Sequence, residues 1–170
     1  DGAQVRFSEL LDSASALPAS TGRRDFAQGG YWVLGCDAGS AQEIHLVADA
    51  GPLGYLSIAA HGHADALAMT LSLGGHEFLI DPGTYAYHSH QAWRDYFRGT
   101  AAHNTVRIDR CDQSLIAGNF MWLKHARAHC EQWQPGQARD LWVGVHEGYR
   151  RLSDPLTHRR QILLDKCERT

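Results

Sequence analysis

Residues 67 to 80 carry the strongest local folding signal in this sequence. Apolar residues alternate with small or polar ones from Leu67 to Leu73, which predicts a strand with one buried face. Gly74-Gly75 follows as a tight turn, and residues 76–80 then form the partner strand of a hairpin. The turn sequence Asp81-Pro-Gly ends this second strand. The hairpin therefore returns Asp81 to the start of the first strand.

Short strand signals of the same kind recur along the chain, with turns between them. They lie at residues 31–34, 43–47, 105–108, 120–125, 141–146 and 161–164. Residues 89–98 instead favour a short helix, with Ser89 as its N-cap and with Trp93, Tyr96 and Phe97 on one face. We therefore expect an all-β fold, an antiparallel β-sandwich of about seven or more short strands with one short helix, rather than a parallel α/β fold.

The length of 170 residues suits one domain. Residues 1–29 are predicted to be a linker or edge segment, in which residues 7–11 could form a short helix, and residues 30–170 the β-sandwich domain. The sequence starts without Met and ends soon after a strand signal. We therefore expect a piece of a longer protein, with a sandwich domain that is incomplete at its C-terminal end.

The composition is that of a folded domain, with 44% hydrophobic and 21% charged residues. A formal net charge of −3 provides no basic footprint for nucleic acid, and no apolar run approaches the ~18 to 20 residues that span a membrane. The 11 histidines stand out, because histidine is the commonest metal-binding side chain. The four cysteines form no CxxC pair, which disfavours a cysteine zinc site. We favour four free thiols, and disulfides in an oxidising compartment are the alternative.

A metal site is predicted from three histidines and one aspartate. In His61-Gly-His63, a spacing of two on an extended chain would put both imidazoles on one face, roughly 6 to 7 Å apart at Cα. Such a pair could chelate one metal, or one histidine could bind metal while the other faces a substrate. The hairpin brings Asp81 beside His63, and His103 precedes the next predicted strand. Two histidines and one carboxylate suit zinc with a fourth position open, whereas surface histidines and an ordinary turn aspartate are the alternative.

Four segments of the chain together resemble a known protein family. They are His61-Gly-His63-Ala-Asp65, Leu79–Tyr85, Tyr96–Val106 and Asp112–Ser114. In these segments the sequence is similar to the heparinase II/III-like polysaccharide lyases. The similarity extends in general layout from Tyr31 to Leu164 and is densest in the part that contains the four segments.

This resemblance implies a fragment of a larger lyase, in which an N-terminal helical toroid precedes antiparallel β-sheet domains and a catalytic cleft lies between them. It also implies that a Zn²⁺ ion with a structural role is bound by His63, Asp81 and His103, and that His61 faces the cleft. The metal would pin the loop that carries His61 to the hairpin and to His103, and would thereby orient His61.

The chemistry implied by the resemblance is β-elimination on a uronic acid within an acidic polysaccharide. The uronate carboxylate must be neutralised while a base takes the C5 proton and an acid protonates the leaving oxygen at C4. His61 could be the base or the neutralising group, and Tyr87 or Tyr96 could be the proton donor. The toroid usually supplies a tyrosine and an Asn or His for the remaining roles. The isolated chain is therefore expected to lack activity.

Substrate contacts are expected from Arg98, Asn104 and Trp93. The guanidinium of Arg98 matches the geometry of a uronate carboxylate, and a structural salt bridge is its alternative role. Trp93 and Phe97 stand at helical spacing, which favours packing in the core over a platform for sugar rings.

Two other functions are compatible with these residues. One is a non-catalytic carbohydrate-binding or accessory β-domain with a structural metal, and the other is a metal-dependent hydrolase on a jelly-roll scaffold. A glycosaminoglycan, alginate or a bacterial exopolysaccharide would each suit the lyase chemistry. The resemblance implies a periplasmic or secreted protein, although the chain shows no signal peptide. Unpaired strand edges are expected to cause self-association of the isolated chain, and no nucleic-acid or membrane partner is expected.

Overall fold

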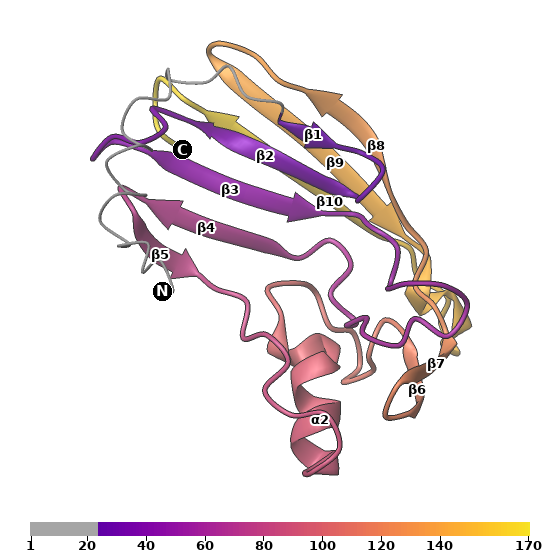
Figure 1. Cartoon of the computed structure of the whole chain (residues 1–170). Helices are drawn as coiled ribbons and strands as arrows, with labels where there is room; N and C mark the ends of the chain where they lie inside the picture. Colours follow the sequence, from indigo (N-terminus) through magenta and orange to yellow (C-terminus); the bar gives the residue numbers. More distant parts are fainter. Residues whose placement is uncertain (1–23) are drawn as a thin grey trace, which may run out of the picture.

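The computed structural model describes residues 24–170, which form two antiparallel sheets packed face to face (Figure 1) and a third, two-stranded antiparallel sheet of β6 (Leu115–Gly118) and β7 (Met121–Lys124). The larger sheet has five strands in chain order: β1 (Asp25–Phe26), β2 (Tyr31–Cys36), β3 (Ile44–Asp49), β4 (Met69–Leu73) and β5 (His76–Leu79). The smaller sheet has three: β8 (Ala128–Gln134), β9 (Arg139–His146) and β10 (His158–Asp165). Strands that are consecutive in each sheet pair antiparallel. The predicted antiparallel β-sandwich is therefore confirmed.

A group of shorter elements lies beyond one end of the sandwich (Figure 1). It consists of α2 (Gln91–Arg98), β6 (Leu115–Gly118), β7 (Met121–Lys124) and the 3₁₀ helices η1 (Thr100–Ala102) and η2 (Gly148–Arg151). The chain enters this region after β3 and again after β5 (Figure 1). Among the described residues, no helix is long and apolar enough to cross a membrane.

The core lies between the two sheets and follows the alternation of their strands. Buried and more exposed residues alternate along β2 and β3, as expected for strands with one face in the core. The buried residues of the core include Trp32, Leu34, Ile44, Leu46 and Ala48 from the larger sheet, and Trp142 and Leu164 from the smaller one. The Trp32 and Trp142 rings meet across the interface with centroids 6.1 Å apart. Such aromatic pairs add about 0.5 to 1.5 kcal/mol beyond the area that they bury.

The predicted hairpin is confirmed as β4 and β5, joined by Gly74-Gly75. Both glycines have positive φ, +55° and +80°, which a two-residue hairpin turn requires and which other residues adopt at a cost. The first strand begins at Met69 rather than at Leu67, because Leu67 has a φ of 59° and leaves the extended conformation. The Leu67 side chain is nevertheless fully buried in the core.

The predicted strand at residues 105–108 is wrong. The Thr105 hydroxyl donates to the Ala66 carbonyl at 2.8 Å, and the Tyr149 hydroxyl donates to the Val106 carbonyl at 2.7 Å. Side-chain groups thus supply the hydrogen bonds that a neighbouring strand would otherwise provide. The β-branched composition of the segment gave a strand signal, but this signal does not report which groups the fold brings beside it.

Other local expectations have mixed outcomes. The helix is confirmed, but its N-cap is His90 without a side-chain capping bond, so Ser89 does not cap it. The short strand β6 and the longer strand β8 were not predicted from the sequence. All four cysteines are free thiols.

The N-terminal segment is described only in part. Residues 1–23, which include the predicted short helix at 7–11, lie outside the described residues. β1 pairs with β2 at the edge of the larger sheet, through Asp25↔Trp32 and Phe26↔Tyr31. The predicted boundary between a linker or edge segment and the domain, at residues 29 and 30, stays a prediction.

One buried carboxylate links the two sheets. Asp140 of β9 is fully buried and accepts hydrogen bonds from Arg24 at 3.1 Å and from the Gly35 amide of β2 at 3.0 Å. The Lys166 ammonium and the Gly136 amide complete its partners at 2.9 and 3.1 Å. Burial alone would raise the pKa of Asp140, but the hydrogen bonds outweigh it and lower the pKa below its usual range. The contact therefore joins β9 of the smaller sheet to β2 of the larger sheet.

A buried histidine pair makes the stability of the smaller sheet depend on pH. His146 Nε2 and His158 Nδ1 lie 3.0 Å apart, and the remaining nitrogen of His146 accepts the Gly148 amide at 3.1 Å. Burial lowers the pKa of His146 to about 3 and that of His158 to about 4, from an ordinary value of 6.5. Below pH 6.5 the unfolded chain therefore binds more protons than the folded chain, and stability is lost as the pH falls toward 4.

We expect the free energy of unfolding to fall with decreasing pH more steeply in the wild type than in a His146→Asn, His158→Gln double variant. The difference should approach about 1.4 kcal/mol per pH unit for each proton involved. Urea unfolding at intervals from pH 7 to pH 4.5 measures it, and the exposed His88→Gln variant should keep the wild-type slope. Equal slopes in the wild type and the double variant would show that the pair does not titrate as described.

Candidate functional site

The loop between β3 and β4 carries His61 and His63 and is tightly packed. Gly62 is buried between them, and a Cβ on it would lie 1.6 Å from the Leu53 carbonyl oxygen. The Trp122 indole donates to the Gly62 carbonyl at 3.2 Å. Only glycine allows this close approach of two backbone segments.

The two histidines of this loop have different surroundings. His61 is exposed, and its ring contacts Tyr87 and Phe120 with centroids 5.8 and 5.9 Å away. His63 is partly buried, and its ring centroid lies 5.2 Å from that of His103. The prediction that both imidazoles share one face of an extended strand is therefore wrong, because the chain turns at residues 59–66. The other arrangement, with one histidine at the metal group and one facing outward, matches the structure.

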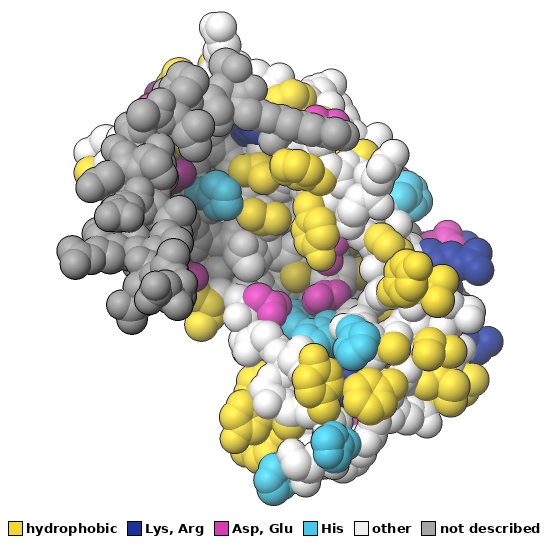
Figure 2. Space-filling model, in the orientation of Figure 1, with side chains coloured by type: hydrophobic (Ala, Val, Ile, Leu, Met, Phe, Trp, Pro, Cys, Tyr) yellow, Lys and Arg dark blue, Asp and Glu magenta, His cyan; other side chains and the backbone are white. Residues whose placement is uncertain are grey.

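Three side chains converge as a candidate metal group. One ligand atom from each of His63, Asp81 and His103 lies within 4.8 Å of the other two. Among the described residues this is the one such group of three or more His, Cys, Asp or Glu side chains. Figure 2 shows histidine and acidic side chains gathered next to each other on this face of the molecule. The prediction that the hairpin brings Asp81 beside His63 is confirmed.

The charges in this group are set by burial and by one short contact. His103 Nδ1 lies 2.6 Å from Asp81 Oδ2, and this hydrogen bond lowers the pKa of Asp81. Burial works to lower the pKa of His103, but the contact with Asp81 and the charge of Asp65 outweigh it and raise the pKa. Burial, and then the charge of His103, lower the pKa of His63 to about 4, so His63 is neutral at pH 7. A neutral imidazole is the form that binds metal.

These residues fit a divalent metal. His103 Nε2 is buried and has no hydrogen-bond partner, and His63 Nε2 has only the Thr84 hydroxyl at 3.2 Å. Two imidazoles and a carboxylate are a zinc ligand set, and ligand atoms that share one zinc ion lie about 3 to 4 Å apart. Small side-chain rotations would close the observed spread of 4.8 Å. The orphaned nitrogen is the observation that most favours a bound ion, because buried polar atoms are rarely left unpaired.

A ring cluster surrounds His61 on the outer side of the same loop. Tyr87 and Phe120 stack with centroids 5.9 Å apart, and both contact the His61 ring. Tyr87 is about half exposed, so its hydroxyl can be reached from solvent together with His61. The predicted pairing of His61 with Tyr87 is therefore close in space, whereas Tyr96 contacts Trp93 and Phe97 on α2 instead.

Helix α2 buries the opposite face from the one that its sequence predicted. Trp93 and Tyr96 are 52% and 49% exposed, whereas Arg94 and Arg98 are fully buried. The expectation that Trp93 packs in the core is therefore wrong. The core side of this helix is polar because backbone carbonyls of the β6–β7 turn face it and accept the guanidinium hydrogen bonds.

The structure favours the structural role for Arg98. Its guanidinium is buried, pairs with Asp95 at 2.6 Å and donates to the carbonyls of Gly118 and Asn119 at 2.7 and 3.0 Å. Substrate contact by Arg98 is therefore not supported, because these internal contacts occupy the buried group. The Asn104 amide donates to the Ile80 carbonyl at 2.8 Å, which places Asn104 beside the hairpin end and near Asp81.

Arg94, Phe120 and Thr84 adjoin the site and were missed by the sequence analysis. Arg94 stands at helical spacing from Arg98, just as Trp93 does from Phe97, so two stripes compete for the buried face. Hydrophobicity alone predicts that the aromatic stripe is buried. The arginine stripe is buried instead because carbonyl groups that are distant in the sequence accept its hydrogen bonds. No local signal in the sequence places Phe120 beside His61.

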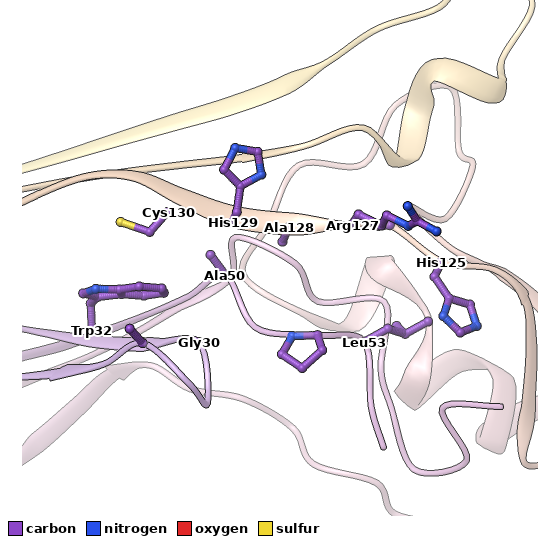
Figure 3. Close-up of a pocket in the computed structure, with 12 residues that line it drawn as sticks. Gly30, Trp32, Ala50, Leu53, His125, Arg127, Ala128, His129 and Cys130 are labelled. Atoms are coloured by element: carbon purple, nitrogen blue, oxygen red, sulfur yellow. The ribbon is translucent and has the colours of Figure 1, made fainter. Parts of the chain in front are cut away.

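A cavity of about 500 Å³ lies elsewhere, between the start of β2, the end of β3 and the start of β8 (Figure 3). Residues that line it include Trp32, Ala50, Leu53, His125, Arg127 and His129. In Figure 3 the His129 ring points away from the Trp32 ring, so the polar groups do not converge on one point. The group at His63 is therefore the better candidate for a functional site.

Fold and site together define a two-sheet β-domain with a His/Asp/His group beside an exposed histidine. Residues 18–169 match the family described as "Heparinase II/III-like, C-terminal", and the chain belongs to this family. No match was found among the curated proteins.

Solved structures share the fold. A heparinase III matches with a TM-score of 0.69 and 23% identity, over 92% of this chain and 22% of that chain. Another heparinase III structure matches with a TM-score of 0.64 and 24% identity, over 86% and 21% of the two chains. The heparan sulfate lyase HepC from Pedobacter heparinus matches with a TM-score of 0.60 and 20% identity, over 82% and 19%. The chain thus spans about a fifth of the length of these proteins.

The contact between Gly62 and Leu53 generates a prediction about the site loop. Gly62→Ala should lower the free energy of unfolding by about 1 to 3 kcal/mol or more, because the added methyl group overlaps the Leu53 carbonyl. Gly118→Ala is the matched control, since a Cβ there would meet nothing within 4 Å. Urea unfolding of both variants measures the difference. Equal stabilities would mean that the loop has room that the structure does not show.

Proposed function

We propose that this chain is the β-sheet domain of a polysaccharide lyase that cleaves uronic-acid-containing polysaccharide by β-elimination. The observation that carries the proposal is the position of His61, which is exposed beside Tyr87 and stands two residues before His63 of the candidate metal group. Membership of the heparinase II/III-like family supports it. The solved relatives that share the fold are named as heparinase III and heparan sulfate lyase.

In the proposed reaction, His61 acts next to the uronate and Tyr87 acts at the leaving group. A base takes the C5 proton, the electron pair forms the C4–C5 double bond, and the C4–O bond breaks as an acid protonates its oxygen. His61 is the candidate for the base or for the group that neutralises the carboxylate. Tyr87 is favoured over Tyr96 as the acid, because its ring contacts His61, whereas the Tyr96 ring contacts Trp93 and Phe97. The other partners would come from parts of the protein outside this chain.

A metal held by His63, Asp81 and His103 would supply a fixed positive charge that holds the loop against the hairpin. The chain's own residues then hold His61 in place, since Gly62 locks the loop onto Leu53 and Trp122 bonds its carbonyl. His61 itself is exposed and lies outside the ligand group. This separation supports a structural role for the ion.

Zinc is the ion that we expect at this group. Elemental analysis of protein purified without added metal should give about one equivalent of zinc per chain. His63→Ala should lose the metal and lower the melting temperature, because binding free energy is lost from the folded state. His61→Ala should retain both. Less than about a tenth of an equivalent of any divalent metal in the wild type would refute the metal site.

The catalytic role of His61 requires the full-length protein that carries this domain. There, His61→Ala should lower turnover on the true substrate by about 10² to 10⁴, the range for loss of a general acid or base. Zinc content and melting temperature should not change. Ultraviolet absorbance of the unsaturated product measures the rate and separates elimination from hydrolysis, which creates no double bond. Near wild-type turnover in His61→Ala would exclude a catalytic role for this residue.

A carbohydrate-binding domain without catalysis is the second candidate. The exposed rings of Trp93 and Tyr96 favour it, because such faces can stack on sugars. If the full-length protein binds uronate polymers and forms no unsaturated product, this second function replaces the first. Self-association of the isolated chain and its lack of elimination activity stay predictions, for light scattering and the same absorbance assay.

A further inference from the structure

Arg94 is a buried cation that lies against the Tyr87 and Phe120 rings, which contact His61. It is fully buried, and no carboxylate among the described residues forms an ion pair with it. Its Nε donates to the Asn119 carbonyl at 3.1 Å, and its Nη2 lies 3.5 Å from the Ala60 carbonyl oxygen. Its Nη1 has no hydrogen-bond partner. The charge is thus desolvated with incomplete compensation.

The remaining contacts of Arg94 are with two aromatic rings. Its guanidinium carbon lies 5.4 Å from the Tyr87 ring centroid and 5.6 Å from the Phe120 centroid. Both distances fall within the range of cation–π attraction, which is strongest for desolvated cations. Tyr87 and Phe120 are also the two rings that contact His61. One guanidinium therefore holds both neighbours of His61.

Arg94 joins three chain segments that are distant in sequence. It reaches the His61 loop through Ala60, the segment after the hairpin through Tyr87, and the β6–β7 turn through Asn119 and Phe120. A methionine or leucine could fill the same space without the desolvation cost of a charge. A packing role alone therefore does not account for an arginine here, whereas a need to hold two rings and two carbonyls at once does.

We propose that Arg94 is a positioning residue that fixes the rings of His61 and Tyr87 relative to each other. It does not touch substrate, since it is buried, and it acts through the Tyr87 and Phe120 rings above it. The inference rests on the proposed function in one respect, because positioning matters for turnover only if His61 and Tyr87 act on the substrate. The geometric part of the inference stands apart from that function.

The test compares Arg94→Met and Arg94→Lys with the matched control Arg98→Lys. Arg98 is equally buried, lies one turn further along α2 and shares the Asn119 carbonyl, but its guanidinium carbon lies over the Trp122 ring at 5.3 Å. In the 170-residue chain, ring-to-ring nuclear Overhauser contacts between His61 and Tyr87 report the arrangement directly. They should be lost in Arg94→Met, weakened in Arg94→Lys and retained in Arg98→Lys. Retained contacts in a folded Arg94→Met chain would overturn the proposal.

Turnover in the full-length protein tests the functional part. Arg94→Met should lower kcat on the order of tenfold to a hundredfold, the effect of misplacing a catalytic group by about 1 Å. The KM should change much less, and Arg94→Lys should restore part of the loss. If Arg94→Met keeps the wild-type kcat while His61→Ala loses it, the positioning role is wrong and the proposed function stands. If both variants keep the wild-type kcat, the proposed function itself fails. Should Arg94→Met not fold, the kcat and ring contacts of the charge-preserving Arg94→Lys decide: wild-type values in both would overturn the proposal.

Discussion

Hydrogen bonds to three backbone carbonyls hold the chain beside the candidate ligands, and the donor of two of them, Arg160, ties this part of the chain to the β-sandwich. Gln113 donates to the Ala66 carbonyl at 2.9 Å from a buried side chain. One nitrogen of Arg160, on β10, donates to both the Leu67 and the Asn104 carbonyls, at 2.6 and 2.8 Å. A buried carbonyl without a partner costs free energy comparable to a lost hydrogen bond, so these contacts stabilise the fold around the site. Because His63 lies shortly before Ala66 and His103 directly before Asn104, the same contacts set where both histidines stand.

Structural features that depend on residues close together in the sequence were predicted correctly. The hairpin was predictable because alternation and a Gly-Gly turn lie within fourteen residues of each other, from Leu67 to Ile80. The position of Asp81 follows from that hairpin. His103 was included in the predicted site because it precedes a predicted strand, and the family resemblance supported this, but no local rule places it beside His63.

The failures arose where distant groups decide the outcome. Residues 105–108 have the composition of a strand, but hydroxyl groups of Thr105 and Tyr149 hold this part of the chain. Helix α2 carries an aromatic and an arginine stripe, and the carbonyls of the β6–β7 turn determine that the arginines are buried. In both cases the deciding partner is absent from the local sequence window. Hydrophobic periodicity gives the existence of an element more reliably than the face that it buries.

The burial of the arginine face of α2 also determines which side chains of the helix reach the surface. Burying two arginines uses backbone carbonyls as their partners, which leaves the aromatic side chains of the helix on the surface. His63 lies with Asp81 and His103 in the candidate metal group, whereas His61 lies in the ring cluster with Tyr87 and Phe120, and the packed Gly62 backbone separates the two histidines. A change in the candidate metal group should therefore reach His61 in part through Gly62. In the proposed function the exposed His61 would meet the substrate while the buried Gly62 and Arg94 hold it in place, which is the arrangement that preorganised sites require.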